Sequence, residues 1–241
     1  MISRYTRPEM GGVWSDENKF RQWLNVELAS VEVLAEQGEV PAEAARRLRE
    51  HAAFSVSRIA EIEKEVRHDV IAFTTSVAES MRAAGYPEAS RWFHYGLTSN
   101  DVVDTAQALQ IQEASRLILR ELDALIVVLE KRAWEFKDAI AIGRTHGIHA
   151  EPITFGLKLA LWFDEALRAR RRFEAAAEDL RFGKLSGAVG ALAHISAEAE
   201  EAICRKLGLE AAPVTSQVIA RDRHAAWVSA LALVCALCDW S

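Results

Sequence analysis

A short segment in the middle of the chain concentrates side chains that can move protons. Residues 143–152 read Gly-Arg-Thr-His-Gly-Ile-His-Ala-Glu-Pro, with two histidines, an arginine and a glutamate. A histidine in a tight loop suits acid–base catalysis because its pKa lies near neutrality. His146 and His149 could instead suggest a metal pair, but Gly147 interrupts a helix between them, and zinc pairs usually come with a further carboxylate or cysteine at matching spacing. We therefore favour a catalytic histidine in this loop over a metal pair, and expect no metal.

A second cluster precedes the longest expected helix. His94 is followed by Gly96-Leu97-Thr98-Ser99-Asn100-Asp101, in which Asp101 stands three residues after Thr98, the spacing of a capping box. Free backbone N–H groups, the hydroxyls of Thr98 and Ser99 and the positive end of the helix dipole can also bind a carboxylate or phosphate. The two interpretations are compatible, since a cap can also hold a ligand.

Three weaker clusters allow either a functional or an ordinary interpretation. Arg67-His68-Asp69 lies between two expected helices, where Asp69 could orient the imidazole or simply cap the next helix. Near the N-terminus, Arg4 and Tyr5 could bind a phosphate together with Arg7, although a frayed basic terminus explains the same residues. Thr215-Ser216-Gln217, by spacing alone, is an ordinary loop before a helix.

Composition indicates a globular protein. Of 241 residues, 50% are hydrophobic and 27% charged, with a formal net charge of −6, which disfavours nucleic acid as a partner but permits a small anionic substrate. Three cysteines and no secretory leader favour a reducing cytoplasm. The longest apolar stretch, 225–238, is shorter than the roughly 20 residues that cross a membrane. We expect a helix buried on all sides there, with Cys235 and Cys238 as core thiols.

Helical spacing dominates, and no segment shows sustained strand alternation, so we expect an all-α fold. Helices are expected from Ser15 to near Gly38, from Pro41 onward, and over about 57–66 and 70–84. Residues 99–136 lack Gly and Pro and predict a helix roughly 55 Å long. Two more long helices are expected, over 152–182 and from near Arg221. Residues 1–93 are thus expected to form a small helical domain, and 94–241 the start of a long-helix bundle that is incomplete in this chain.

Five motifs, in order, resemble the adenylosuccinate lyases of the short bacterial and archaeal type, members of the fumarase/aspartase superfamily. The resemblance covers essentially the whole chain. The motifs are Ser3-Arg4-Tyr5 with Pro8-Glu9-Met10; Arg67-His68-Asp69-Val70; His94-Tyr95-Gly96-Leu97-Thr98-Ser99 with Asp101-Val102-Val103-Asp104-Thr105; Gly143-Arg144-Thr145-His146-Gly147 with His149-Ala150-Glu151-Pro152; and Gln217 with Arg221-Asp222-Arg223-His224.

The resemblance implies a helical homotetramer with a 20-helix core, in which three subunits build each active site. It implies β-elimination of fumarate from adenylosuccinate and from the succinylated imidazole-carboxamide ribotide, without cofactor or metal. The general acid would be His146, and His68 would lie beside the substrate. The remaining residues that the resemblance assigns to the substrate pocket are Arg67 and Asp69 beside His68, Thr98 and Ser99 on the succinyl part, Arg4 and Tyr5 on the phosphate, Gln217 on the dicarboxylate, and His94 in the lining.

One departure and two alternatives remain. The catalytic base of the family is a serine on a Gly/Ser-rich loop that does not occur in these 241 residues, so we expect the chain alone to be nearly inactive. Within the superfamily, an argininosuccinate lyase or a cycloisomerase is the nearest alternative. A non-catalytic helical oligomerisation module is the alternative from a different class.

Overall fold

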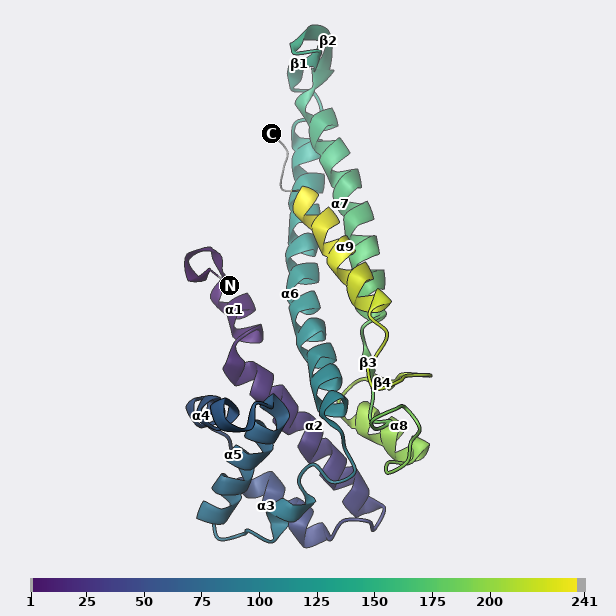
Figure 1. Cartoon of the computed structure of the whole chain (residues 1–241). Helices are drawn as coiled ribbons and strands as arrows, with labels where there is room; N and C mark the ends of the chain where they lie inside the picture. The colour runs from purple at the N-terminus through teal and green to yellow at the C-terminus, as the bar shows by residue number, and fades with distance from the viewer. Residues whose placement is uncertain (1, 238–241) are drawn as a thin grey trace. The chain divides into compact units, whose positions relative to one another are not determined.

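The computed structural model describes residues 2–237, which form two compact units (Figure 1). Unit 1 contains the described residues up to Glu113 together with Arg181–Ala220. Unit 2 contains Ala114–Leu180 and the described residues from Arg221 onward. Unit 1 is therefore built from two separate stretches of chain. The domain boundary expected near residue 93 stays a prediction.

Unit 1 is mainly helical and holds most of the predicted site residues. Its helices are joined by one short parallel strand pair, in which Phe182 is opposite Glu210. Its elements are η1 (Ser3–Tyr5), α1 (Pro8–Val13), α2 (Asp16–Glu36), α3 (Ala42–His51), α4 (Val56–Val66), α5 (Asp69–Ala83), η2 (Ala89–Trp92), the first part of α6 (Ser99–Glu135), β3 (Phe182–Gly183), α8 (Ala197–Lys206) and β4 (Glu210–Ala211).

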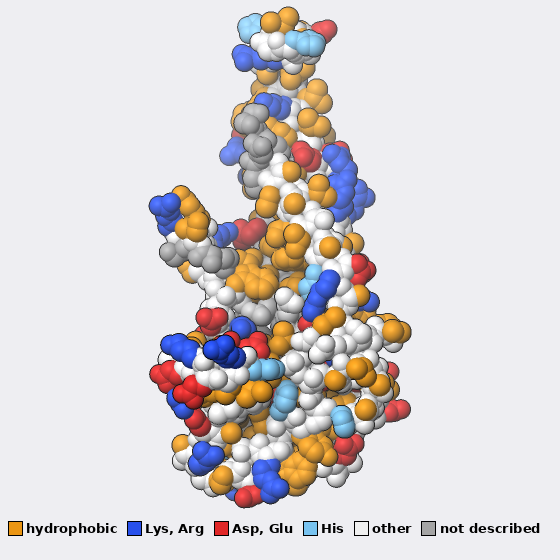
Figure 2. All heavy atoms as spheres, in the orientation of Figure 1, with side chains coloured by type: hydrophobic (Ala, Val, Ile, Leu, Met, Phe, Trp, Pro, Cys, Tyr) orange, Lys and Arg blue, Asp and Glu red, His pale blue; other side chains and the backbone are white. Residues whose placement is uncertain are grey.

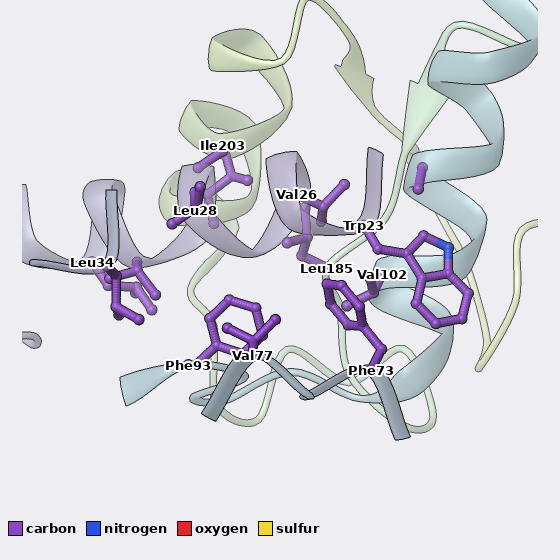
Figure 3. Close-up of a cluster of buried hydrophobic side chains, with 14 of the residues drawn as sticks. Trp23, Val26, Leu28, Leu34, Phe73, Val77, Phe93, Val102, Leu185 and Ile203 are labelled. Atoms are coloured by element: carbon purple, nitrogen blue, oxygen red, sulfur yellow. The ribbon is translucent and has the colours of Figure 1, made fainter. Parts of the chain in front are cut away.

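Aromatic side chains hold the core of unit 1 together. Trp23 on α2 meets Phe73 on α5 edge-to-face with ring centroids 5.5 Å apart, and Phe20 stacks on Phe73 at 5.9 Å. Figure 3 shows Trp23 and Phe73 beside Val26, Leu185 and others from segments far apart in the sequence. Such burial of large apolar groups is the main term that stabilises a fold of this kind. It fixes α2 against α5, and both helices carry residues of the candidate site.

Unit 2 consists of the rest of α6, an antiparallel hairpin of β1 (Ile140–Thr145) and β2 (Ile148–Thr154), α7 (Phe155–Glu178) and α9 (Asp222–Ala236). Its core includes Leu122, Leu159 and Ala166. Large apolar side chains also remain exposed in this unit, among them Val127, Trp134, Leu157 and Leu161. Figure 2 shows hydrophobic side chains at the surface along α6 and α7.

The helical fold predicted from the sequence is confirmed, and so are most of the expected helices. Ser15 caps α2 by accepting the Asn18 N–H at 3.1 Å, and Gly38, at φ 82°, follows its end. The helix expected over 99–136 is α6, which spans 37 residues. Two short helices, α1 and α8, have no counterpart among the expected elements.

Two local expectations about unit 2 are wrong. Residues 140–154 form a β-hairpin, so α7 begins at Phe155, where Thr154 caps it, and not at Pro152. The last helix is not buried on all sides: α9 buries Trp227 and Ala230 but leaves Val228 and Cys235 exposed, because within unit 2 it packs mainly against α7. Cys238 lies outside the described residues. None of the described helices has the length and apolar character needed to cross a membrane.

Candidate functional site

One pocket in unit 1 brings together four of the predicted site residues. His68, His94, Thr98 and Ser99 line a cavity of about 220 Å³. The remaining lining residues are Val70, Ile71, Thr74 and Leu97. Two chain segments therefore meet here: the start of α5, and the turn that leads into the first residue of α6. Two imidazoles, two hydroxyls and the N-terminus of a 37-residue helix make the pocket suited to an anion.

His68 reaches the pocket because it is the N-cap of α5. Arg67 ends α4 in the left-handed region at φ 52°, which turns the chain sharply between the two helices. The Nδ1 atom of His68 accepts the Ile71 N–H at 3.4 Å, so a neutral ring carries its proton on Nε2. Asp69 Oδ1 accepts the Val70 N–H at 2.7 Å and lies 3.5 Å from His68 Nδ1, within reach of a protonated ring. The cap is thus His68 itself and not Asp69.

His94 is held by a buried carboxylate from another part of the chain. Glu27 on α2 is fully buried, and its Oε2 accepts the His94 backbone N–H at 2.9 Å. Its Oε1 lies 2.6 Å from His94 Nδ1. Burial by itself would lower the pKa of His94, but the hydrogen bond and charge of Glu27, with the charge of Asp101, outweigh it and raise the pKa above its ordinary value. His94 therefore stays cationic to a higher pH than a free imidazole.

The start of α6 carries the capping interaction expected from the sequence. The Thr98 N–H donates to Asp101 Oδ2 at 2.8 Å, which is the return half of the predicted capping box. Asp101 is fully buried and forms an ion pair with Lys184 at 2.6 Å, also fully buried. The Nζ of Lys184 donates further to the Gly187 carbonyl at 2.7 Å. Asp101 therefore joins the two stretches of unit 1, because it contacts both Lys184 and the turn that holds Thr98.

A second set of buried polar contacts reinforces this junction. Thr105 Oγ1 donates to the Lys184 carbonyl at 2.9 Å, and the Lys184 backbone N–H donates to Thr105 Oγ1 at 3.0 Å. Asp104 Oδ2 accepts the Ile219 N–H at 2.8 Å, and Ser186 Oγ lies 2.6 Å from Thr215 Oγ1. Buried polar groups with satisfied hydrogen bonds rigidify their surroundings. The N-terminal end of α6 is therefore held in place by the segment 184–219.

His146 lies in unit 2, at the tip of the β-hairpin. The antiparallel register places Thr145 opposite Ile148, which leaves His146-Gly147 as a two-residue turn. Both residues have positive φ, 52° and 75°, as a type I′ turn requires. His146 is exposed, and Figure 2 shows histidine side chains at the surface of this hairpin. The expected tight loop is thus a hairpin turn that presents the imidazole to solvent.

The other predicted substrate residues lie outside the pocket lining. Arg4 and Tyr5 are exposed in η1, where the Arg4 guanidinium lies 4.7 Å from the centre of the Tyr5 ring. Gln217 is exposed in the segment that leads to Ala220, and Arg67 is exposed at the end of α4. These side chains are available to a ligand, but the structure does not bring them together with His68 and His94.

Glu27 and Lys184 were not predicted from the sequence. Each belongs to the site only through a partner far along the chain, 67 residues away for Glu27 and 83 for Lys184. Glu27 does leave one signal, since it is a charged residue flanked by Val26 and Leu28 in the apolar part of a helix. A charge in that place needs a buried partner, although the pattern cannot say which residue provides it.

Comparison with known proteins identifies the family. A family model described as "Lyase" matches residues 3–239. The chain belongs to this lyase family. Among curated members, adenylosuccinate lyase of Bacillus subtilis (strain 168) is 48% identical over 234 residues, which cover 97% of this chain and 53% of the relative. Adenylosuccinate lyase of Staphylococcus saprophyticus is 47% identical over the same length and with the same coverage. The chain spans about half the length of these lyases, and the resemblance inferred from the motifs is confirmed.

Solved structures of lyase-like enzymes share the fold. The 3-carboxy-cis,cis-muconate lactonizing enzyme from Pseudomonas putida superposes with a TM-score of 0.89 at 29% identity, covering 98% of this chain and 55% of that one. A fumarate lyase from Mesorhizobium sp. BNC1 gives 0.85 at 28% identity, covering 95% and 54%. The expected fumarase/aspartase-like helical architecture is therefore confirmed.

Proposed function

We propose that this chain forms part of an adenylosuccinate lyase, which releases fumarate from adenylosuccinate to give AMP and from the succinylated imidazole-carboxamide ribotide to give its amide. The observation that carries the proposal is the pocket at the start of α6, where His68, His94, Thr98 and Ser99 meet. It is supported by the 47–48% identity to curated lyases of that name. The reaction belongs to purine synthesis, which takes place in the cytoplasm.

The chemistry matches the groups available. A base removes a proton from the carbon next to a substrate carboxylate, the electron pair forms the C=C bond of fumarate, and the C–N bond breaks as the nitrogen takes a proton from an acid. His146 is proposed as that acid, His68 would lie beside the substrate, and Arg67 and Asp69, the neighbours of His68 in the sequence, would also contact the bound substrate. Thr98 and Ser99 at the N-terminus of α6 would hold the succinyl carboxylate, where N–H groups and the dipole favour negative charge.

The remaining predicted residues take binding roles in the proposal. Arg4 and Tyr5 would hold the nucleotide phosphate, Gln217 the dicarboxylate, and His94 the pocket wall. A homotetramer is proposed as the working assembly, which would bury the apolar side chains that α6 and α7 leave exposed, such as Val127 and Leu157. Light scattering after size exclusion would measure the assembly, and a monomer at micromolar concentration would contradict it.

The decisive test is turnover of adenylosuccinate by the complete lyase, of which this chain is proposed to be a part, carrying the substitution His146→Ala. Loss of a general acid is expected to lower kcat by about 10²–10⁴-fold. His149→Ala, in the same hairpin and also exposed, is the matched control and should retain most of the activity. An unchanged kcat for His146→Ala would exclude the assigned acid and favour a non-catalytic helical module.

A cycloisomerase is the second candidate, favoured by the TM-score of 0.89 with the muconate lactonizing enzyme. The two candidates differ in the ligand that they bind. Calorimetry should detect binding of AMP and no binding of argininosuccinate or a carboxymuconate. Binding in the opposite order would replace the proposed substrate while keeping the superfamily.

A further inference from the structure

Glu27 is a buried acid whose two oxygens serve a single residue. It is fully buried between Val26 and Leu28 on α2, among side chains of the apolar core. An ionised carboxylate in such surroundings is strongly unfavourable unless it is paired and hydrogen-bonded. Within the described residues, its hydrogen bonds go to the backbone N–H and the ring Nδ1 of His94. The two hydrogen bonds to His94 therefore account for its place in the core.

His94 has a backbone that needs this support. Its φ of 64° lies in the left-handed region, which is unfavourable for a residue with a Cβ atom. One oxygen of Glu27 fixes the backbone at 2.9 Å and the other fixes the ring at 2.6 Å. Two attachment points determine both where the residue lies and how its imidazole is turned. Local strain of this kind persists only where the surroundings over-determine it, often at functional sites.

The Glu27 contact leaves one ring nitrogen of His94 for a ligand. Since Nδ1 is taken, Nε2 is the donor that remains, and His94 lines the pocket together with His68 at the start of α5 and Thr98 before α6. The other charge that acts on His94 is Asp101 on α6, which is already paired with Lys184.

We propose that Glu27 is a positioning residue, which fixes His94 as a cationic Nε2–H donor to an anionic group in the pocket. The identity of that anion, the succinyl or fumarate carboxylate, rests on the proposed function. The control of Glu27 over His94 does not, because it follows from the geometry of the pair. The pair as a whole is neutral, so the pocket gains a directed donor without the cost of an unpaired buried charge.

Glu27→Gln separates the charge from the placement. The amide keeps the shape of the carboxylate, and its oxygen still accepts the His94 backbone N–H, but its NH₂ group faces Nδ1 and favours a neutral ring. Glu17→Gln is the matched control, because Glu17 lies on the same helix but is exposed and pairs with Arg21 in the adjacent turn. Labelled histidine NMR across pH reports the His94 titration directly, and fumarate added to the same samples reports binding.

The expected result is that wild-type His94 titrates above the ordinary range, that Glu27→Gln moves the titration to lower pH, and that Glu17→Gln leaves it unchanged. Fumarate should bind about tenfold more weakly to Glu27→Gln, since a bond from a cationic donor becomes one from a neutral donor. If Glu27→Gln does not fold, the wild-type spectrum decides by itself.

Two results would overturn the inference. One is a wild-type His94 that titrates at or below the ordinary histidine range, and the other is a titration that Glu27→Gln does not move. A shifted titration without any fumarate binding would leave the Glu27–His94 relation standing and contradict the proposed function instead.

Discussion

Replacing Lys184 with methionine should destabilise unit 1 more than any surface change. Lys184 and Asp101 are both fully buried and 2.6 Å apart, so Lys184→Met leaves an uncompensated carboxylate in the core while keeping the volume of the side chain. Removing one partner of a buried pair costs about 3–5 kcal/mol. The Thr98 and Gly187 N–H groups still donate to Asp101, which places the expectation near the lower end of that range. For a protein of this size, about 3 kcal/mol corresponds to a fall in Tm of roughly 6–12 °C.

Urea unfolding followed by circular dichroism measures this loss, and two variants sharpen it. Lys206→Met is the matched control, because Lys206 is partly exposed and pairs with Glu32 at 3.0 Å, so it should cost about 0–1 kcal/mol. Adding Asp101→Asn to Lys184→Met removes the stranded charge and should recover part of the loss. Equal stability of the Lys184 and Lys206 variants would refute the claim that the buried pair holds the two stretches of unit 1 together.

Three further predictions follow from single positions. Gly156→Ala should destabilise unit 2 by about 1–3 kcal/mol in urea unfolding, because its Cβ would lie 2.5 Å from the Ala133 carbonyl oxygen; an unchanged midpoint would contradict this close approach. Gly147→Val should weaken the hairpin by about 1–2 kcal/mol, because a φ of 75° is strained for a residue with a Cβ atom, even though no neighbouring atom lies within 4 Å of that Cβ. Amide hydrogen exchange in β1 and β2 should therefore become faster, and an unchanged exchange rate would refute the prediction. Burial raises the pKa of the Cys204 thiol to about 12, so iodoacetamide at pH 8 should modify the exposed Cys235 and spare Cys204, as peptide mass spectrometry would reveal. The folded protein keeps that proton above pH ~8.5, where the unfolded chain releases it, and this group therefore lowers stability as the pH rises from there toward 12.

The sequence predicted those elements whose signals are local. The long run without Gly or Pro after Ser99 became α6, and the Thr98–Asp101 spacing became a real capping contact. Ser15 caps α2 as expected, because a hydroxyl before an amphipathic run satisfies a free N–H wherever the helix packs. Convergence of His68, His94, Thr98 and Ser99 on one pocket was expected from the resemblance; the catalytic and binding roles assigned to them remain predictions.

The features that could not be predicted depend on partners distant in sequence or on weak turn chemistry. The hairpin around His146 lacks the Asn-Gly or Asp-Gly turn that normally signals one, and its register shifts between Ile142 and Arg144, which breaks the alternation of a regular strand. Glu27 pairs with His94 across 67 residues. The expected burial of α9 assumed neighbours on every side, whereas unit 2 supplies them mainly from α7.

The division of unit 1 into two stretches has a consequence for how the protein is made. A ribosome that has just incorporated Asp101 must add about 80 more residues before Lys184 is part of the chain, which takes roughly 4–16 s at ordinary elongation rates. During that interval the nascent α6 carries a carboxylate without its cation, and Leu185 and Ile203 are missing from the core. Unit 1 therefore completes its core only after Leu185 and Ile203 have been added, and the apolar residues of its first stretch stay partly uncovered until then.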